Sequence, residues 1–298
     1  MTDKPPIANE SQKAEAKAWF ETLRDQICAK FEALEDRVPL HPQIDGIPAG
    51  RFQRSSWKRE DQVDPTSDSG GGVMAVMRGG RVFEKVGVNC STVYGQFSEE
   101  FAASIPGAEQ GNRNFWASGI SLVAHPRSPH VPIAHMNTRL VVTSKSWFGG
   151  GGDLTPIFPI AQDTADFHHA FKQACDHHDA GYYDEFKAWC DKYFYLPHRD
   201  EMRGVGGIFY DYLNRQGWDQ DFAFTKAVGG AFRDIYPEII ARHYDKAWTQ
   251  ADKQAQEHKR SRYVEFNLIY DRGTKFGLMT NGHTEAILVS MPPTASWH

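Results

Sequence analysis

The sequence predicts an α+β domain in which helices flank an extended antiparallel β-sheet. Strand-like segments follow one another with short gaps from residue 73 to about residue 145. This order is typical of an antiparallel meander rather than of alternating βα units. Apolar residues at helical spacing precede and follow these segments. Because the chain contains neither an internal repeat nor a linker-like stretch, a single domain over residues 11–298 is the simplest organisation.

The N-terminal region is expected to be a tail followed by one long helix. Residues 1–10 are predicted to be disordered, and residues 11–35 to be helical. The apolar residues that recur at helical spacing in this segment are Trp19, Phe20, Leu23, Ile27, Phe31 and Leu34. Residues 36–72 are expected to be irregular, because they contain the stretches HPQIDGIPAG and DPTSDSGGG.

The remaining elements are expected in the order strands, helices, hairpin. The strand-like segments cover residues 73–97, 115–126 and 134–145. The helices are expected at about 163–178, 182–195 and 219–258. Residues 262–282 alternate apolar and polar side chains, and they are predicted to form a hairpin that bends near Asp271.

Composition and charge exclude several classes of protein. No apolar stretch approaches the roughly 18 residues of a membrane-spanning helix, so membrane insertion is not expected. The N-terminus lacks the apolar core of a signal peptide. A net charge of −5 provides no broad positive surface for nucleic acid, so an anionic ligand would need a local arginine cluster. The four cysteines are far apart and form no CxxC pair, which favours buried, reduced thiols and a cytoplasmic location.

Residues 147–156 read WFGGGGDLTP, with four glycines directly before Asp153. A phosphate-binding loop is rejected, because it needs a lysine where this chain has a carboxylate, which would repel phosphate. Two interpretations remain. The glycines form a flexible turn after a strand, or they let a bulky flat molecule approach the backbone beside Asp153.

The strand expected at 134–142 carries the most informative pattern. Side chains alternate between the two faces of a strand, so His135, Asn137 and Arg139 point the same way. A solvated sheet face would explain this grouping. An acid/base group, an amide and a fixed cation on one face would also suit a site that holds a carboxylate and moves a proton.

Other histidines lie on separate segments. His125 follows the strand before 134–142, His168 lies at the edge of a helical apolar stripe, and His198 comes just before Arg203 and a second glycine-rich turn. Histidines that converged from such segments would bind a divalent cation, but the chain has no HxH or HExxH spacing. From the residues alone, the chain has a sheet face suited to a flat, anionic small molecule, and the reaction is not identified.

The same segments resemble the oxygen-dependent coproporphyrinogen III oxidase family. The matching motifs run in the family's order over about residues 50–293. They are SWKRE (56–60), GVNCSTVYG (87–95), ISLVAHPRSPHVP (120–132), H-x-N-x-R (135–139), WFGGGGDLTP (147–156), YLPHRDEMRGVGGIFYDYL (195–213) and the long stretch 262–293.

The resemblance implies a fold and a reaction. The family has a large antiparallel sheet with helices on both faces and forms a homodimer, with the C-terminal region implicated in the dimer contacts. Its members oxidatively decarboxylate two propionates of coproporphyrinogen III to vinyl groups, which gives protoporphyrinogen IX in haem biosynthesis. Molecular oxygen is the co-substrate, and carbon dioxide and hydrogen peroxide are released. No flavin, haem or NAD is implied, whereas a divalent metal cation is a candidate cofactor.

The resemblance also implies roles for individual residues. The catalytic residues would be His135, as proton donor, with Asp271 and Arg272. The substrate-contacting residues would be Ser121, Asn137, Thr138, Arg139, Asp153, Arg203, Asn281, Gly282 and His283. The four histidines that would bind the metal are His125, His135, His168 and His198. One departure stands out, since the chain has TNGHTEA at 280–286 where family members often have TGGRTES.

Two other functions remain open at this point. A non-haem iron oxygenase would need two histidines and a carboxylate around one metal. A tetrapyrrole carrier would need the arginines but not a proton donor, so it would tolerate loss of His135. A sheet protein with merely solvated charges would not explain seven motifs in one family's order.

Overall fold

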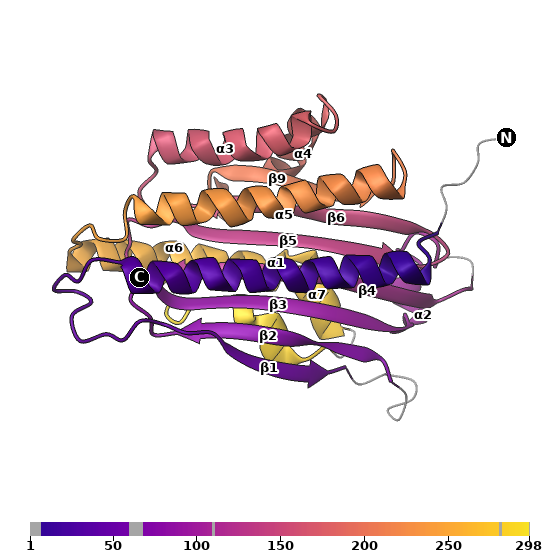
Figure 1. Ribbon diagram of the computed structural model, residues 1–298, viewed down its shortest axis with the longest axis horizontal. Helices are drawn as coiled ribbons and strands as arrows, with labels where there is room; N and C mark the ends of the chain where they lie inside the picture. The colour runs from indigo at the N-terminus through magenta and orange to yellow at the C-terminus, as the bar shows by residue number, and fades with distance from the viewer. Residues whose placement is uncertain (1–6, 60–67, 109–110, 280–281, 298) are drawn as a thin grey trace.

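The computed structural model describes residues 7–59, 68–108, 111–279 and 282–297. It contains a seven-stranded sheet in the order β1-β2-β3-β4-β5-β6-β9, and every neighbouring pair is antiparallel. Helices cover both faces of this sheet (Figure 1). The predicted α+β class with a large antiparallel sheet is therefore confirmed.

The N-terminal helix α1, Glu10–Arg37, begins earlier than the sequence pattern indicated. Asn9 accepts a hydrogen bond from the backbone N–H of Gln12, and the Gln12 side chain accepts one from the Asn9 N–H. This reciprocal cap satisfies backbone donors that would otherwise lack partners at a helix start. Ala8 is buried and donates its N–H to Ser146. The prediction of disorder is therefore wrong for residues 8–10, and residues 1–6 lie outside the described part of the chain.

The sheet follows the predicted meander and extends it at both ends. Its strands are β1 (Gln53–Lys58), β2 (Gly70–Arg78), β3 (Phe83–Gln96), β4 (Asn114–Pro126), β5 (Ile133–Val142), β6 (Ser146–Thr155) and β9 (Gly206–Leu213). Strand β1 lies in the region expected to be irregular, and a short helix, α2 (Glu99–Ala102), follows β3. The four glycines lie inside β6, so the prediction of a flexible turn there is wrong.

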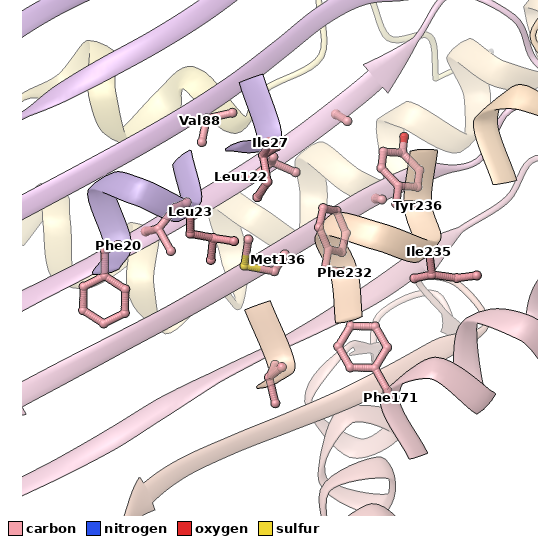
Figure 2. Close-up of a cluster of buried hydrophobic side chains, with 14 of the residues drawn as sticks. Phe20, Leu23, Ile27, Val88, Leu122, Met136, Phe171, Phe232, Ile235 and Tyr236 are labelled. Atoms are coloured by element: carbon pink, nitrogen blue, oxygen red, sulfur yellow. The ribbon is translucent and has the colours of Figure 1, made fainter. Parts of the chain in front are cut away.

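Three helices cover one face of the sheet and enclose the main core. They are α1, α3 (Ala161–Asp176) and α5 (Trp218–Ala241), which lie in front of the strands in Figure 1. Figure 2 shows how Leu122 of β4 and Met136 of β5 meet Leu23 and Ile27 of α1 and Phe232 of α5. All five side chains are buried. Burial of apolar area is the dominant favourable contribution to folding, so this face supplies most of the stability.

The opposite face is covered by the C-terminal elements. They are α6 (Gln250–Ile269), α7 (Arg272–Met279), α8 (Thr284–Ile287) and the 3-10 turn η1 (Leu288–Ser290). Tyr263 of α6 packs against Val123 and Ile133 of the sheet, and Val289 of η1 lies over Gly87. Helix α4 (Tyr182–Tyr193) packs beside β9, and the short strands β7 (Tyr195–Leu196) and β8 (Glu201–Met202) follow it.

Two element predictions in this half of the chain are wrong. The helix expected at 219–258 is interrupted between Ala241 and Gln250, where α5 ends and α6 begins. The hairpin expected at 262–282 is instead the end of α6 followed by α7. Val264, Phe266, Leu268 and Tyr270 alternate as in a strand, but the buried pair Tyr263 and Phe266 has the three-residue spacing of a helix.

The four cysteines are buried and unpaired, as the sequence predicted. Among the described residues, no helix is long and apolar enough to cross a membrane.

Candidate active site

The face of the sheet opposite α1, α3 and α5, called the open face below because the C-terminal elements cover it only in part, carries the predicted polar residues. In the register of β5, Asn137 lies opposite Ser121 of β4, and His135 lies opposite Asp153 of β6. Ser121 is exposed and Asn137 is half-buried, so this part of the face is open to solvent. The period-two prediction that His135, Asn137 and Arg139 share one face is confirmed. Thr138 points the other way and is fully buried, so its side chain is not part of this group.

The glycines of β6 divide between the two faces. A side chain at Gly152 would come within 2.8 Å of the Phe171 ring, on the helix-covered face. A side chain at Gly149 would collide with Asp211 and Arg139 on the open face. All four glycines are buried, so Gly149 makes room for the Arg139 and Asp211 side chains on the open face, and Gly152 allows α3 to pack closely against the sheet.

His135 belongs to a chain of three charged or polar groups. Its Nδ1 lies 2.9 Å from Oδ1 of Asp153, and the Arg203 guanidinium lies 2.7 Å and 2.8 Å from the two Asp153 oxygens. Burial alone would raise the pKa of Asp153, but Arg203 and His135 hold that pKa below its ordinary value. An ionised Asp153 accepts a hydrogen bond from Nδ1–H of His135, which leaves Nε2 of His135 as the proton-exchanging atom.

Arg203 is itself held in an aromatic box. Its guanidinium carbon lies 3.9 Å, 4.5 Å and 4.6 Å from the ring centroids of Phe194, Tyr263 and Phe266. Only 2% of Arg203 is exposed. Such a cation is stabilised by ring faces and by the Asp153 carboxylate, both of whose oxygens accept from Nη2, rather than by water. Arg203 therefore fixes Asp153 from the buried side and is not positioned to meet a substrate carboxylate.

Two arginines reach the open face around one carboxylate that the sequence analysis did not identify. Arg139 and Arg272 lie 2.8 Å and 3.7 Å from Oδ2 of Asp211. The Arg139 and Arg272 side chains are 31% and 50% exposed, so both can be reached from solvent. Burial opposes the charge of Arg139, but Asp211, Tyr193 and Asp271 together raise the pKa of Arg139 above its ordinary value.

Asp271 lies next to this cluster at the start of α7. Its Oδ1 accepts a hydrogen bond of 2.9 Å from the Tyr193 hydroxyl, and its Oδ2 accepts one of 2.7 Å from the Thr274 N–H. Tyr193 also accepts a bond from the Arg272 N–H. Burial, followed by Asp271, raises the pKa of Tyr193 to about 12. Asp271 remains half-buried, so its remaining lone pairs can still meet a ligand.

The other predicted metal-binding histidines have separate partners. His125 is fully buried, its Nε2 donates to the Ser290 carbonyl, and burial lowers its pKa to about 3. His168 bonds to Tyr183 and to the Val205 carbonyl.

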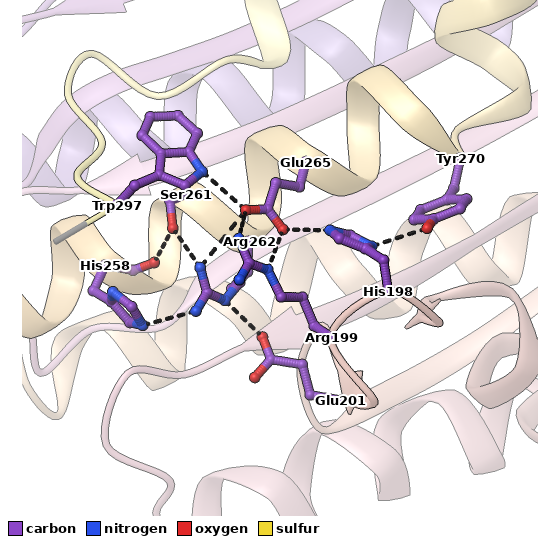
Figure 3. Close-up of polar contacts among 9 residues, drawn as sticks. All are labelled: His198, Arg199, Glu201, His258, Ser261, Arg262, Glu265, Tyr270 and Trp297. Carbon is purple, nitrogen blue, oxygen red and sulfur yellow. Dashed lines mark hydrogen bonds and ion pairs between the residues drawn. The ribbon is translucent and has the colours of Figure 1, made fainter.

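His198 belongs to a different cluster, which Figure 3 shows around Glu265. Glu265 accepts bonds from His198, Arg199 and Trp297, and Arg199 is the main cause that lowers the pKa of Glu265 to about 2. This cluster ties the β7–β8 connection and the C-terminal segment to α6. In the described ranges, no three His, Cys, Asp or Glu side chains are grouped so that they could hold a metal ion. The four-histidine metal site remains a prediction.

The segment expected to contact substrate near residue 282 lies over the far end of the same face. His283 stacks on Trp57 of β1 and accepts a hydrogen bond from the Ala286 N–H. Gly282 donates its N–H to the Gly277 carbonyl. Asn281 lies outside the described residues.

Comparisons with known proteins agree with this geometry. The model of the family described as "Coproporphyrinogen III oxidase" matches residues 15–298. A protein named oxygen-dependent coproporphyrinogen-III oxidase from Rickettsia bellii (strain RML369-C) is 55% identical over 289 residues, which are 97% of this chain and 99% of that protein. A protein of the same name from Rickettsia africae (strain ESF-5) is 54% identical over 290 residues, which are 97% of this chain and 100% of that protein. The chain therefore belongs to the coproporphyrinogen III oxidase family.

Proposed function

We propose that this protein is an oxygen-dependent coproporphyrinogen III oxidase of the cytoplasm. It converts two propionates of coproporphyrinogen III to vinyl groups and so forms protoporphyrinogen IX for haem biosynthesis. The observation that carries the proposal is the open sheet face on which His135, braced by Asp153, lies on the same strand as Arg139. The family membership and the names of the relatives support the same activity.

The reaction balances with O2 as the only oxidant. For each propionate, the bond to the carboxylate breaks with loss of CO2, and its electron pair forms the new C=C bond. The carbon next to the ring loses a hydride equivalent, and O2 accepts this hydride and one proton to give H2O2. The protein must hold the carboxylate, polarise the pyrrole and move a proton.

One propionate of the substrate is assigned to Arg139 and Arg272 together. Guanidinium groups pair with carboxylates in two parallel hydrogen bonds, which fix direction as well as charge. Both side chains are solvent-accessible, whereas Arg203 is buried against Asp153. Arg203, expected to bind substrate, is therefore assigned to supporting Asp153.

The pyrrole N–H groups are assigned to Asp271. Both oxygens of Asp153 are already engaged and its side chain is 2% exposed, so Asp153 is assigned to orienting His135. Asp271 is accessible and can accept N–H bonds from the ring, which would make the pyrrole more electron-rich toward O2.

The proton that O2 needs to form H2O2 is assigned to Nε2 of His135. Asp153 holds the Nδ1 proton, so the opposite nitrogen faces the open side, where the Asn137 amide lies 3.4 Å away. A histidine in this arrangement can deliver the proton that the reduced oxygen needs.

The decisive experiment uses metal-stripped protein with coproporphyrinogen III, first under air and then under argon. The products are separated by chromatography and measured by porphyrin fluorescence. Formation of protoporphyrinogen IX only under air is the expected result. Turnover only after a divalent cation is restored would instead support the metal prediction for His125, His135, His168 and His198. Tight tetrapyrrole binding without turnover under any condition would overturn the enzyme proposal in favour of a carrier.

The proposal includes a homodimer that forms through the C-terminal helices. Leu268 and Ile269 of α6 and Leu278 of α7 are 50%, 45% and 43% exposed. Large apolar side chains in this position are typical of an interface between chains. Sedimentation of the wild type should give a dimer, and Leu268→Glu with Ile269→Glu should give a monomer. A monomeric wild type would contradict this part of the proposal.

A further inference from the structure

We infer that Asp211 is a positioning residue that holds Arg139 and Arg272 together as one propionate-binding site of single net positive charge. This inference rests on the proposed function, because it concerns how the arginines present themselves to the substrate. In this inference the Asp211 carboxylate acts on the arginines and does not contact the substrate. It also explains why the backbone of β9 is irregular at this position.

The local backbone turns Asp211 toward the open face. The register between β6 and β9 shifts between Phe148 and Gly150, which pair with Leu213 and Tyr210. Asp211 and Tyr212 together therefore oppose the single residue Gly149, which makes a β-bulge. Bulges re-aim side chains and occur often beside active sites.

The bulge contains a strained residue. Tyr212 has a φ of 54°, in the left-handed region that a bulky residue seldom adopts. Such a conformation costs on the order of 1–3 kcal/mol and persists only where its surroundings require it. The N–H of Tyr212 donates to Oδ1 of Asp211 at 3.1 Å. The strained backbone thus fixes the carboxylate, and the other oxygen, Oδ2, is directed at the arginines.

The residue opposite the bulge also fits this arrangement. A Cβ at Gly149 would lie 2.7 Å from Oδ1 of Asp211 and 3.0 Å from Nε of Arg139. Contacts this short are incompatible with the present positions of both side chains. Glycine at position 149 therefore lets Arg139 and Asp211 pack side by side over the sheet.

Charge explains why the pair needs Asp211. Two guanidinium groups near one another repel, and the Asp211 carboxylate between them offsets this repulsion. The Asp211 side chain is only 8% exposed, so water screens these interactions poorly. The two guanidinium groups and the Asp211 carboxylate together carry a net charge of +1, which matches one propionate, and the neighbouring Asp271 is assigned to the pyrrole N–H groups.

A purely structural role predicts a different outcome. If Asp211 only tied α7 to the sheet, its loss would lower stability and leave the kinetic constants of the folded enzyme unchanged. If Asp211 positions the arginines, its loss should lower kcat while substrate binding is retained, because the site gains positive charge.

The test compares Asp211→Asn with Asp163→Asn and the wild type. Asp163 is a matched control, because it is buried and paired with an arginine, Arg242, but lies on α3 on the helix-covered side. For each protein we would measure kcat and KM for coproporphyrinogen III, thermal stability, and the affinity for coproporphyrin III at several salt concentrations. The porphyrin is the oxidised form of the substrate, and its binding does not require turnover.

The expected result is a fall in kcat of about tenfold or more for Asp211→Asn, with KM unchanged or lower. Its affinity for coproporphyrin III should depend more steeply on salt than that of the wild type. Asp163→Asn should lower thermal stability and keep wild-type kinetic constants. If Asp211→Asn behaves like Asp163→Asn, or like the wild type, the inference is overturned.

Failure of the proposed function would look different. In that case the wild type itself would not turn over coproporphyrinogen III. The affinities for coproporphyrin III alone would then test the role of Asp211. A steeper salt dependence in Asp211→Asn would still support the charge role of Asp211. Equal salt dependence in the two proteins would overturn it.

Discussion

The two faces of the seven-stranded sheet are made by alternate residues of the same strands, yet they have opposite properties. Met136 and Leu122 face α1 and α5 in a dry apolar core. His135 and Ser121, their neighbours in the chain, face the open side among charges and hydrogen bonds. A single strand such as β5 therefore serves stability on one face and chemistry on the other.

The difference teaches how a rigid site is obtained on a sheet. The three helices fix the strands from one side, so the spacing of His135, Asp153 and Arg139 is set by strand register rather than by a loop. Residues on regular elements hold a site more precisely than residues on loops. The comparison predicts that substitutions on the open face change catalysis and substitutions on the covered face change stability.

The strongest test of the open face is His135→Gln. Loss of a general acid or base commonly lowers turnover by about 10²–10⁴-fold. Stability should change little, because Asp153 keeps both bonds to Arg203. Turnover of coproporphyrinogen III and binding of coproporphyrin III would be measured together, with His177→Gln on the exposed end of α3 as the control. Undiminished turnover in His135→Gln would remove the proton-donor role.

The strongest test of the covered face is Met136→Ala, one residue along the same strand. Met136 is fully buried, and such truncations cost about 2–5 kcal/mol through lost transfer free energy and the cavity left behind. Urea unfolding should show a lower midpoint, while the KM of the folded enzyme stays at the wild-type value. Met74→Ala is the matched control, because Met74 is half-buried and, by register with Asn89, lies on the open face. Equal losses in the two variants would contradict the division between faces.

Lys85 tests the comparison through the pH dependence of stability. This lysine is 7% exposed, lies opposite His125 in the register of β3 and β4, and donates to the Met291 carbonyl. Burial, followed by Arg78, lowers its pKa from 10.5 to about 8. Between these two values the unfolded chain binds more protons than the folded one, so wild-type stability should rise with pH across this window, by at most about 1.4 kcal/mol per pH unit.

The variant Lys85→Met lacks the titrating group. Its stability relative to the wild type should be greatest at pH 8 and below, and this advantage should shrink as the pH rises toward 10.5. Urea unfolding at several pH values measures the difference, with the exposed Lys192→Met as the control. A difference that does not vary with pH would refute the assignment.

The fold was predictable where one periodicity dominated. Consecutive alternating segments indicated the antiparallel sheet, because neighbouring strands in a meander need only short turns. Strand β1 was missed since most of its residues are exposed, so it has no apolar alternation. The end of α6 was misassigned because Leu268, which is exposed on the helix, falls in the alternating apolar pattern of Phe266 and Tyr270.

The site was predictable only as far as local sequence carries it. The two-residue spacing of His135, Asn137 and Arg139 places them on one face without tertiary information. Asp211 and Tyr193 could not be identified in this way. Asp211 depends on a β-bulge, and no residue pattern in the sequence indicates its register shift. Tyr193 meets Asp271 only because the end of α4 lies beside the junction of α6 and α7, 78 residues away in the chain.

Tyr193→Phe is the smallest change on the open face that tests such a tertiary contact. The variant keeps the ring that stacks on Phe209 at 4.4 Å and removes only the hydroxyl that Asp271 and the Arg272 N–H share. A hydrogen bond to a charged group is worth about 1.5–3 kcal/mol, but Asp271 keeps its bond from Thr274, so kcat should fall only several-fold. The control is Tyr183→Phe, which removes a hydroxyl that bonds to His168 away from Asp271. If both variants lose turnover equally, the hydroxyl of Tyr193 contributes to folding alone. A larger loss of turnover in Tyr193→Phe than in Tyr183→Phe would show that the reaction depends on the orientation of Asp271 and not merely on its presence.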